Sequence, residues 1–486
     1  MTTNKSMSRR EFLKFAGVAA GGSLLAACAP QVQTVVVTSP AQIQTQVVTS
    51  VVTQQVVQQV TQQVEVTSTP QPGTGPKINK DISGKITFWG HWASPVRKTA
   101  VLRMIAQINK TLPSLTVDYV YKPFGDLWTA VITAVASGTG MPDVFIEDRP
   151  NLPNRAANGV DTDLQPLIDR DGLDPKVFWP FTWQQTLYKD HSYGIPFETD
   201  VRVLWYDQTQ WTDAGLDPAN PPKTWDDIKA AADKLDVKEG GKFTRLTFMP
   251  YGMGNVSPTI WAYTEGINLP SEDGSTVNVQ QDQFKDVLNW IKSWIDRYGG
   301  LTAVKTYLNT FGSPPNDPFM SGGVATDPDI GGYESQLNFY RPKVMSKGKS
   351  TNMTWGATLL PYKVKPASWS GGFAMSIPKG AANQDAAWEF IKVASGYDAN
   401  LSWARDTQAM PTVMAAAEDP ILTSDPWWKV DIEAMKVSTG GIYVPKYPGW
   451  ENELGNRYDD MFSGKVTIDQ GLADAQKAID DQMAKA

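Results

Sequence analysis

The chain has 486 residues, with 44 Lys and Arg against 51 Asp and Glu, and a formal net charge of −7. This mildly acidic balance, with no basic cluster, argues against a nucleic-acid partner. One cysteine and two histidines exclude an intramolecular disulfide and leave little for metal or acid–base chemistry, so we expect no metal and no cofactor. A chain of this length exceeds one ordinary core, which favours two or three domains.

The N-terminus has the order of an export signal. Arg9 and Arg10 precede a modestly apolar stretch, and "SRREFLK" resembles the twin-arginine signals that send folded proteins across a bacterial membrane. "LAAC" then resembles a lipobox, whose cysteine, here Cys28, carries diacylglycerol and becomes the new N-terminus. A transmembrane anchor is the alternative, but the stretch is too short and too rich in Ala and Gly for a span of about 20 residues. We predict a signal peptide over residues 1–27 and a lipid-anchored protein on the outer face of the cytoplasmic membrane.

Residues 28–76 are of low complexity and consist mostly of Val, Gln, Thr and Ser. This segment has no aromatic residue, and Glu65 is its only charge, so it cannot fold around a core. We interpret it as a flexible tether of about fifty residues that spans on the order of 40 Å. A self-associating Val/Gln stalk is the alternative.

Strand and helix signals alternate in the body of the chain. "GKITFWG" predicts a strand that stops at Gly90, with His91 and Trp92 just beyond it, and "MPDVFIEDRP" predicts a strand that delivers Glu147 and Asp148. In open α/β sheets, ligands bind outside the carboxyl ends of the strands. We therefore expect a binding site at these two strand ends.

Three segments have the apolar period of amphipathic helices. "PVRKTAVLRMIAQINKTLP" lies between the two strands. In "PPKTWDDIKAAADKLD", Thr224 and Asp227 form a capping-box pattern that places Trp225 on the buried face. The C-terminal "TIDQGLADAQKAIDDQMAKA" repeats the pattern with its own apolar stripe. The 18 tryptophans exceed what a core of this size needs, so we expect some at a functional surface.

The segment "GIPFETDVRVLWYDQTQWTDAGLDPANPPKTW" resembles the central segment of the family 1 extracellular solute-binding proteins of ABC importers, a group that includes maltose- and other sugar-binding lipoproteins. The same family order continues through "DPFMSGGVATDPDIGGYES", "WSGGFAMSIPKGAANQDAAWEF" and "MFSGKVTIDQGLADAQKAI". The resemblance extends from about Lys77 to the C-terminus.

The resemblance implies an α/β fold of the type II periplasmic-binding-protein kind, with two doubly wound lobes joined by hinge crossings. Lobe one would comprise residues 77–198 and 376–419, and lobe two residues 205–372 and 426–486. "TDVRVLWYD" would be a hinge strand, and the lobes would close on a small-molecule ligand between them. We expect a monomer whose protein partner is the transmembrane permease of an ABC importer.

The chemistry of a neutral sugar favours carboxylates, which accept hydrogen bonds from hydroxyls, and aromatic rings, which pack against C–H faces. Glu198 and Asp200 are two residues apart, so on an extended strand they share a face. The resemblance also places a ligand-binding acid in this segment. An ion pair at the hinge, for example with Arg202, is the alternative.

The other candidate ligand-binding residues come from strand ends and from loops that match the family pattern. They are His91, Trp92, Glu147, Asp148, Asn255, Trp261, Asp327, Tyr333, Trp369, Gly371, Arg405, Tyr447 and Trp450. Core packing is the alternative for Trp92, and an ion pair with Arg149 is the alternative for the two acids after the second strand. We expect more than half of the set to line the cleft.

The identity of the solute stays open at this level. A sugar or oligosaccharide is favoured, but carboxylates and tryptophans also suit a polyamine. A phosphodiester calls for arginines and helix N-termini, for which Arg405 alone is thin support. Iron sites usually contain paired tyrosines, which are not seen among these candidates.

A secreted glycoside hydrolase is the alternative from another class, because two acids on one strand face are about 7 Å apart, which suits an inverting enzyme. Against it, Glu198 and Asp200 share one strand and do not flank a bond from opposite sides. We therefore predict a binding protein without catalytic residues.

Overall fold

The structure is a computed structural model that describes residues 75–340, 345–346, 349–350 and 354–485. All of these belong to one unit, Gln71–Ala486. The predicted signal peptide, Cys28 and nearly all of the predicted tether lie outside the described residues. Within the described part of the chain, no helix combines the length and the apolar character that a membrane span requires.

The first sheet has six strands in the order β16-β6-β15-β3-β1-β2. They are β1 (Gly84–Gly90), β2 (Leu115–Tyr121), β3 (Val144–Asp148), β6 (Ile195–Thr199), β15 (Gly372–Ser376) and β16 (Met410–Pro411). β1 is parallel to β2 and β3, and β15 is antiparallel to β3 and β6. The carboxyl ends of β1, β2, β3 and β6 and the amino end of β15 therefore lie at one edge of the sheet.

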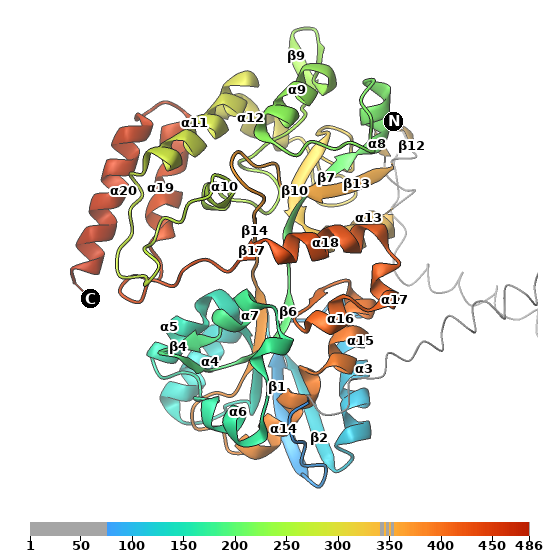
Figure 1. Ribbon diagram of the computed structural model, residues 1–486, viewed down its shortest axis with the longest axis vertical. Coiled ribbons are helices and arrows are strands. Elements are labelled where there is room, and N and C mark those ends of the chain that lie inside the picture. The colour runs from blue at the N-terminus through green and yellow to red at the C-terminus, as the bar shows by residue number, and fades with distance from the viewer. Residues whose placement is uncertain (1–74, 341–344, 347–348, 351–353, 486) are drawn as a thin grey trace, which may run out of the picture. The chain divides into compact units, whose positions relative to one another are not determined.

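Helices cover both faces of this sheet (Figure 1). α3 (Pro95–Thr111), α14 (Gln384–Ala394) and α15 (Tyr397–Thr407) pack against one another. The other face carries α4 (Asp126–Ser137), α5 (Leu152–Ala157), α6 (Gln165–Asp171) and α7 (Pro180–Gln184). The predicted first strand and first amphipathic helix are confirmed as β1 and α3, and Ser94 caps α3 by accepting from the Arg97 amide.

The second sheet has three strands in the order β10-β7-β13, and the central strand is antiparallel to both neighbours. They are β7 (Arg202–Asp207), β10 (Thr326–Ile330) and β13 (Trp355–Leu359). The surrounding helices are α8 (Gln208–Asp213), α9 (Trp225–Leu235), α10 (Pro258–Thr264), α11 (Asp282–Arg297), α12 (Leu301–Leu308), α13 (Glu334–Tyr340), α18 (Pro426–Lys436), α19 (Glu451–Phe462) and α20 (Ile468–Met483). They complete a second α/β body.

The capped helix is formed as predicted. The Thr224 side chain accepts from the Asp227 amide at 3.1 Å, and the Asp227 carboxylate accepts from the Thr224 amide at 2.9 Å. Trp225 is buried and stacks on Trp290, with ring centroids 4.1 Å apart. α20 likewise buries its stripe of Leu472, Ala475 and Ile479.

The remaining elements are short. They are β4 (Leu187–Tyr188) with β5 (His191–Ser192), β8 (Val237–Glu239) with β9 (Lys242–Arg245), β11 (Met345–Ser346) with β12 (Lys349–Ser350), β14 (Ser368–Trp369) with β17 (Ser438–Thr439), α16 (Met414–Ala417), α17 (Pro420–Thr423), and three single 3-10 turns at Arg149–Asn151, Pro175–Val177 and Gly331–Tyr333.

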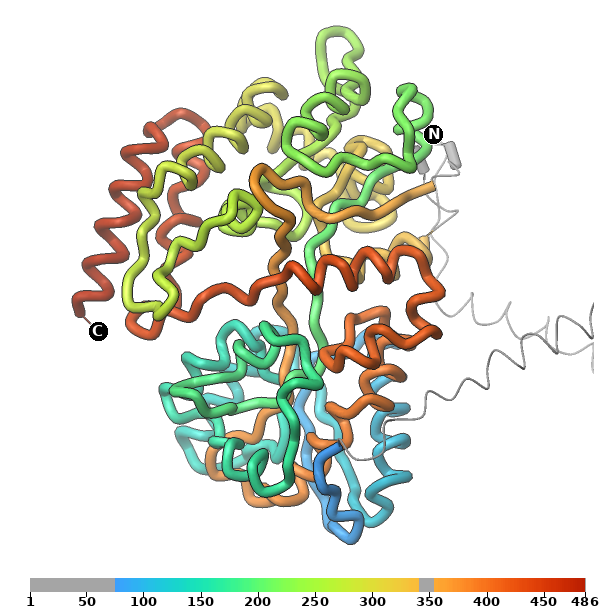
Figure 2. Tube along the Cα trace, in the orientation of Figure 1, coloured from blue at the N-terminus to red at the C-terminus, as the bar shows by residue number. Residues whose placement is uncertain are grey.

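Two segments cross side by side between the sheets, one near residue 200 and one near residue 370 (Figure 2). The Thr199 and Ser370 hydroxyls are 2.7 Å apart, and the Arg202 amide donates to the Ser368 hydroxyl at 2.8 Å. The predicted hinge strand over 199–207 is interrupted: β6 ends at Thr199 in the first sheet, and β7 begins at Arg202 in the second. The crossing itself consists of two residues.

Each sheet has its own core of buried side chains. The first core contains residues from β1, α3, β3, α14 and α15, and the second contains residues from β7, α9, α11 and α20. Trp179 and Phe181 pack in the second core although they belong to the segment expected in lobe one. The division into lobes at the expected boundaries stays a prediction.

Candidate ligand-binding site

A cavity of about 610 Å³ lies between segments that belong to the two sheets. Residues within 149–153 and 181–190 line it on the side of the first sheet. Residues within 263–273 and 440–452, together with Trp369, line it on the side of the second. A ligand held here would touch both bodies at once.

Five aromatic residues line this cavity: Phe181, Tyr263, Trp369, Tyr443 and Trp450. Trp450 is largely buried at the start of α19, whereas Trp369 and both tyrosines are only partly buried. Trp369 follows the crossing segment near residue 370, and the Arg202 guanidinium lies 4.5 Å from its ring centre. The cavity therefore offers flat apolar surfaces for packing.

Arg149 is a fully buried cation in the cavity wall. Its Nη1 donates to Gln185 Oε1 at 2.8 Å, and its Nη2 donates to Thr199 Oγ1 at 2.8 Å and to the Gly371 carbonyl. Burial lowers the pKa of Arg149 to about 10, so the group stays charged at neutral pH. These acceptors are neutral, and Nε has no hydrogen-bond partner among the described residues. The guanidinium therefore retains an unused donor.

Gln185 connects this cation to the opposite wall. Its Nε2 donates to the carbonyls of Ser370 and Gly440, each at 3.1 Å, while its Oε1 accepts from Arg149. A Cβ atom at Gly440 would lie 2.6 Å from Gln185 Cδ. Glycine therefore permits the close approach between α7 and the loop that follows β17.

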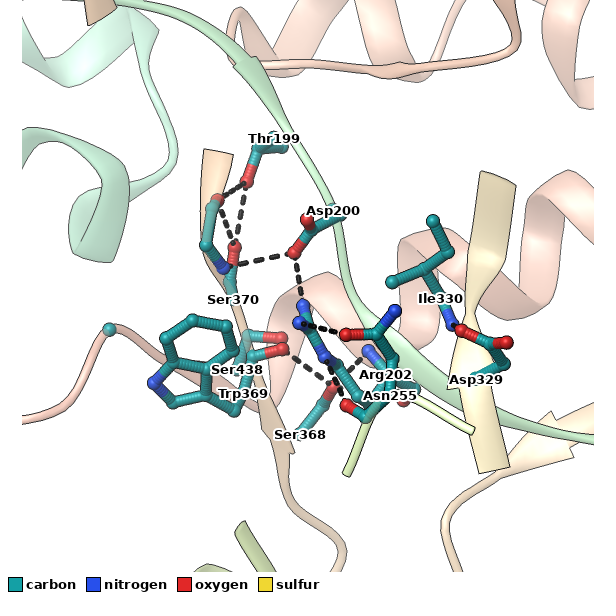
Figure 3. Close-up of polar contacts among 12 residues, drawn as sticks. Thr199, Asp200, Arg202, Asn255, Asp329, Ile330, Ser368, Trp369, Ser370 and Ser438 are labelled. Atoms are coloured by element: carbon teal, nitrogen blue, oxygen red, sulfur yellow. Dashed lines mark hydrogen bonds and ion pairs between the residues drawn. The ribbon is translucent and has the colours of Figure 1, made fainter. Parts of the chain in front are cut away.

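A polar network surrounds the crossing segments, and Figure 3 shows Arg202 between Asp200 and Asn255. Arg202 forms an ion pair with Asp200, and its Nε donates to the Asn255 carbonyl at 3.0 Å. The Asp200 carboxylate also accepts from the Gly371 amide at 2.9 Å. These contacts tie the crossing near residue 200 to the crossing near residue 370 and to the second body.

Glu451 is the carboxylate that α19 brings to the cavity. It is exposed, and Thr259 Oγ1 donates to its Oε2 at 3.5 Å. The surrounding protein displaces water and raises the pKa of Glu451 above its usual range. The group can therefore exchange hydrogen bonds with a polar ligand at the wall of the second body.

The two acids at the end of β3 have different environments. Glu147 is fully buried, and its carboxylate accepts from Arg155 Nε at 2.7 and 2.8 Å. Its ion-pair partner is therefore Arg155, and not Arg149 as the alternative had supposed. Burial still raises the pKa of Glu147 to about 7. Asp148 is partly exposed and accepts from Asn151 at 2.5 Å. Of these two acids, Asp148 is the accessible one.

The shared face expected for Glu198 and Asp200 is not formed. Glu198 is buried in the first body, where it accepts from Trp403 Nε1 at 2.6 Å and pairs with Arg97 at 3.2 Å. Asp200 pairs with Arg202, as the hinge alternative supposed. The reason is that β6 ends at Thr199, so the alternation of a continuous strand does not reach Asp200.

Several other predicted residues pack in the cores and do not line the cavity. Trp92 lies in the first core, in ring contact with Trp403 at 4.5 Å, which favours the packing alternative. Trp261, Asp327 and Tyr333 are buried in the second body. Tyr333 donates to Asp317 at 3.0 Å, and Trp261 donates to the Pro250 carbonyl at 2.9 Å. These contacts satisfy the two ring donors within the protein.

The remaining predicted residues are spread over the molecule. Trp369 and Trp450 line the cavity, and Gly371 contacts the cavity residue Arg149 through its carbonyl. Tyr447 lies just before Trp450 and donates to Glu453 at 2.9 Å, and Arg405 is exposed on α15. His91 is partly buried among aromatic rings. Binding by each of these residues stays a prediction.

Sequence reasoning missed the lining residues Arg149, Gln185, Tyr263 and Glu451. Glu451 had a usable signal, since it follows a candidate tryptophan in "YPGWENEL". Arg149 was considered only as an ion-pair partner for the adjacent acids. Gln185 carries no local signal, because only the fold brings it to residues 185 and 255 positions away in sequence.

Comparison with known proteins agrees with this architecture. The profile of the family described as bacterial extracellular solute-binding protein matches residues 103–433. The maltotriose-binding protein of Pyrococcus abyssi is 22% identical over 352 residues, which cover 71% of this chain and 70% of that protein. The sn-glycerol-3-phosphate-binding periplasmic protein UgpB of Rhizobium meliloti is 22% identical over 427 residues, which cover 80% and 93%.

Among solved structures, CpMnBP1 with mannotriose bound superimposes with a TM-score of 0.68 at 25% sequence identity. The match covers 81% of this chain and 99% of that one. The predicted fold class, a periplasmic-binding-protein-like α/β fold, is thereby confirmed.

Proposed function

This chain belongs to the bacterial extracellular solute-binding protein family, and on that premise we propose that its solute is a neutral sugar or oligosaccharide held in the cavity between the two bodies. The family is one of binding proteins, so the hydrolase alternative is set aside and the expectation of a non-enzymatic protein is confirmed. The solute is then passed to the permease of an ABC importer.

The observation that carries the sugar proposal is the lining of the cavity. Five aromatic rings line it together with hydrogen-bond donors and acceptors, among them Arg149, Gln185 and Glu451. A sugar ring needs this combination, since its C–H faces pack on aromatic rings and its hydroxyls both donate and accept hydrogen bonds. The relatives also support a sugar as the solute, because one is a maltotriose-binding protein and CpMnBP1 was solved with mannotriose bound.

We assign roles to cavity residues from their surroundings. Trp369 and Trp450 stack on the sugar rings, Arg149 places a positive charge in the cavity wall, and Glu451 accepts a hydrogen bond from a hydroxyl or shares a proton with it. These groups belong to both bodies. A ligand that binds all of them has a higher affinity for the arrangement in which the two bodies close on it, and this difference in affinity stabilises the closed arrangement.

A glycerol phosphodiester or phosphomonoester is the second candidate. The specific observation is a charged guanidinium in the cavity wall, that of Arg149, whose direct hydrogen-bond acceptors are neutral, although the carboxylates of Asp148, Asp200 and Glu198 also act on its charge. One relative, UgpB of Rhizobium meliloti, is an sn-glycerol-3-phosphate-binding protein, and that solute is a phosphomonoester. A polyamine stays a further alternative, because the cavity lining also contains the carboxylates of Asp190, Glu272, Asp273 and Glu451.

A thermal-shift screen separates these candidates. It compares malto- and manno-oligosaccharides with sn-glycerol 3-phosphate, glycerophosphocholine and spermidine. A ligand at a hundredfold its Kd stabilises the native state by about 2.7 kcal/mol. We expect stabilisation by saccharides; stabilisation by phosphoesters or spermidine alone would contradict the proposal.

We also propose that the protein is exported and lipid-anchored. The support is the order of Arg9, Arg10 and Cys28 in the sequence, in agreement with an extracellular family. Two acyl chains on Cys28 provide stable anchoring. The tether would then hold the binding body away from the membrane at a distance set by its length.

A further inference from the structure

A short segment, residues 77–83, joins the predicted tether to β1, and we call it the strap. The Lys77 amide at its start donates to the Asp171 carbonyl at 2.8 Å, and just after its end the Gly84 amide donates to the Ser114 carbonyl at 3.2 Å. Asp171 is the last residue of α6, and Ser114 directly precedes β2. Both partners belong to the first body, so the strap is hydrogen-bonded to that body at each end.

Lys392, on α14, is a buried cation at the strap, and none of its side chain is exposed. Its ammonium group has three acceptors: the carboxylates of Asp171 and Glu389 and the carbonyl of Lys77. An ammonium group has three N–H donors, so the strap supplies the last acceptor that this cation needs. Because an incompletely paired buried charge is costly, the contact with the carbonyl of Lys77 holds the strap in place.

Glu389 binds the strap through a second hydrogen bond. Its Oε1 accepts from Lys392 at 2.9 Å, and its Oε2 accepts from the Asn79 amide of the strap at 2.9 Å. The side chains of Ile78 and Ile82 are partly buried and pack against the first core. The strap therefore contacts α6 and α14 through main-chain polar groups and the first core through two apolar side chains.

Asp171 is held by the first body itself. Its carboxylate accepts from Arg170 Nε at 2.9 Å and from Trp388 Nε1 at 2.8 Å. The hydrogen bond from Arg170 lowers the pKa of Asp171 well below its usual range, so this carboxylate is ionised at neutral pH beside Lys392. The groups that bind the strap are thus oriented by contacts within α6 and α14.

The strap leads into the edge of the first sheet that lies away from the second body. It enters β1 at the amino end, whereas the chain crosses to the second body at the carboxyl end of β6 and the amino end of β15. In Figure 2 the dark-blue start of β1 lies at the end of the first body that is farther from the second body. The two bodies can therefore move relative to each other without breaking the contacts of the strap.

We propose that the strap is a clamp that attaches the predicted membrane tether to the first body alone. The second body then closes on the solute without pulling on the anchor, and the clamp protects the strap from proteases that would detach the protein from the membrane. This inference rests on the proposed lipid anchor, which gives the clamp its function, and it goes beyond that proposal by naming the residues at which the tether ends.

Hydrogen exchange of the mature protein, read by mass spectrometry on residues 77–84, tests the clamp. Asn79→Pro removes the amide that donates to Glu389, whereas Asn79→Ala keeps this amide and is the matched control. We expect Asn79→Pro to accelerate exchange of the remaining amides by about ten- to a hundredfold, as for the loss of a hydrogen bond to a charged group, and Asn79→Ala by less than threefold.

A second control places proline where the strap tolerates it. The Ile82 amide donates to the Asn79 carbonyl at 3.3 Å, so Lys80 is the second residue of a turn, a position that favours proline. Lys80→Pro should therefore leave the exchange of the strap unchanged. Equal melting temperatures confirm that the first body is folded in all three variants.

A lysine-specific protease tests the function of the clamp on membrane fractions. Residues 28–76 contain no lysine, so the first sites at which this protease can detach the protein are Lys77 and Lys80, both in the strap. We expect Asn79→Pro to be released from membranes about tenfold faster than the wild type and Asn79→Ala.

Three results would overturn the proposal. A wild-type strap that exchanges as fast as an unstructured peptide would show that no clamp exists. Equal exchange and equal release of Asn79→Pro and Asn79→Ala would show that the hydrogen bond to Glu389 does not hold the strap. Wild-type protein outside the membrane fraction would remove the anchor and with it the function of the clamp, while exchange would still show whether the strap is bound.

Discussion

Trp225 and Trp369 show how one residue type has two roles in this molecule. Trp225 is 6% exposed, stacks on Trp290 and donates to the Pro361 carbonyl at 3.1 Å. Trp369 is partly buried and borders the cavity. The surplus of tryptophans suggested a functional surface, but 14 of the 18 are largely buried and only Trp183, Trp290, Trp369 and Trp427 are clearly exposed in part. Composition could not separate these roles because both need a large flat ring.

At the residue scale, we predict that Trp225→Ala lowers stability and leaves ligand affinity unchanged. The substitution removes a stacked, buried ring and should cost about 3–5 kcal/mol of unfolding free energy. Urea denaturation measures the loss, and calorimetry on the folded fraction measures the affinity. A weakened affinity at full folding would show that α9 is coupled to the site.

A second prediction concerns the contact between Gly440 and Gln185. A methyl group at Gly440 would displace Gln185 and break its hydrogen bonds to Arg149, Ser370 and the Gly440 carbonyl. We expect Gly440→Ala to destabilise the protein by about 1–3 kcal/mol.

The matched control is the same substitution in a Gln185→Ala background, where the clash is absent. The double variant should then cost clearly less than the sum of the two single variants, since the residues act on one set of contacts. Additive losses in urea denaturation would show that this contact is unimportant.

At the scale of elements, local sequence signals predicted the helices and strands better than they predicted which residues each side chain contacts. β1, α3, the capping box of α9 and the stripe of α20 follow from period and cap residues. The break between β6 and β7 was missed, because "TDVRVLWYD" has the β-branched and aromatic composition of one continuous strand. The position of Glu198 against α15 depends on residues 205 positions apart, which no local pattern encodes.

α13 and α18 carry a group of buried acids that predicts a pH dependence of stability. Burial, followed by repulsion from Asp425, raises the pKa of Glu334 from 4.5 to about 7, and burial raises that of Asp431. A raised pKa in the folded state stabilises the protein fully below the unfolded pKa of 4.5, and this contribution is lost as the pH rises through about 7.

We therefore expect Glu334 to contribute a fall in the unfolding free energy as the pH rises from about 4.5 to about 7, and Glu334→Gln to remove about 1–2 kcal/mol of that contribution. The amide keeps the shape of the protonated acid and does not titrate. His91, whose pKa is lowered from 6.5 to about 4, acts in the opposite direction between these two values and does so equally in the wild type and in Glu334→Gln, so the difference between the two proteins isolates Glu334. Urea denaturation across the window measures the effect. An unchanged slope in Glu334→Gln would contradict it, while Glu147, with a pKa of about 7, should leave a residual slope.

At the scale of the whole molecule, the family order of motifs predicted two bodies and a site between them, and the cavity lies between segments of the two sheets. The walls of that cavity come from segments as distant as residues 149 and 451, so most of its residues could not be inferred one motif at a time. Of the two predicted tryptophans that do line it, Trp450 came from the family pattern, and Trp369 from the two glycines that follow it in "ASWSGG".

The anchor is also a property of the whole molecule. We predict that Cys28→Ser releases the protein from membranes, because the lipid would be attached to the only thiol of the chain. Fractionation of cells and the intact mass of the mature protein measure this. Wild-type protein without added lipid, together with a variant that stays in the membrane fraction, would contradict the prediction.

The most direct test of the central claim is calorimetric titration of the wild type and Trp369→Ala with the saccharide that gives the largest thermal shift. Trp369 borders the cavity and is only partly buried, so the substitution should leave the protein folded. The account predicts saturable binding to the wild type and at least about a tenfold weaker Kd in the variant, as expected for a stacked ring. Equal affinities in the two proteins, or no binding of any saccharide to the wild type, would contradict it.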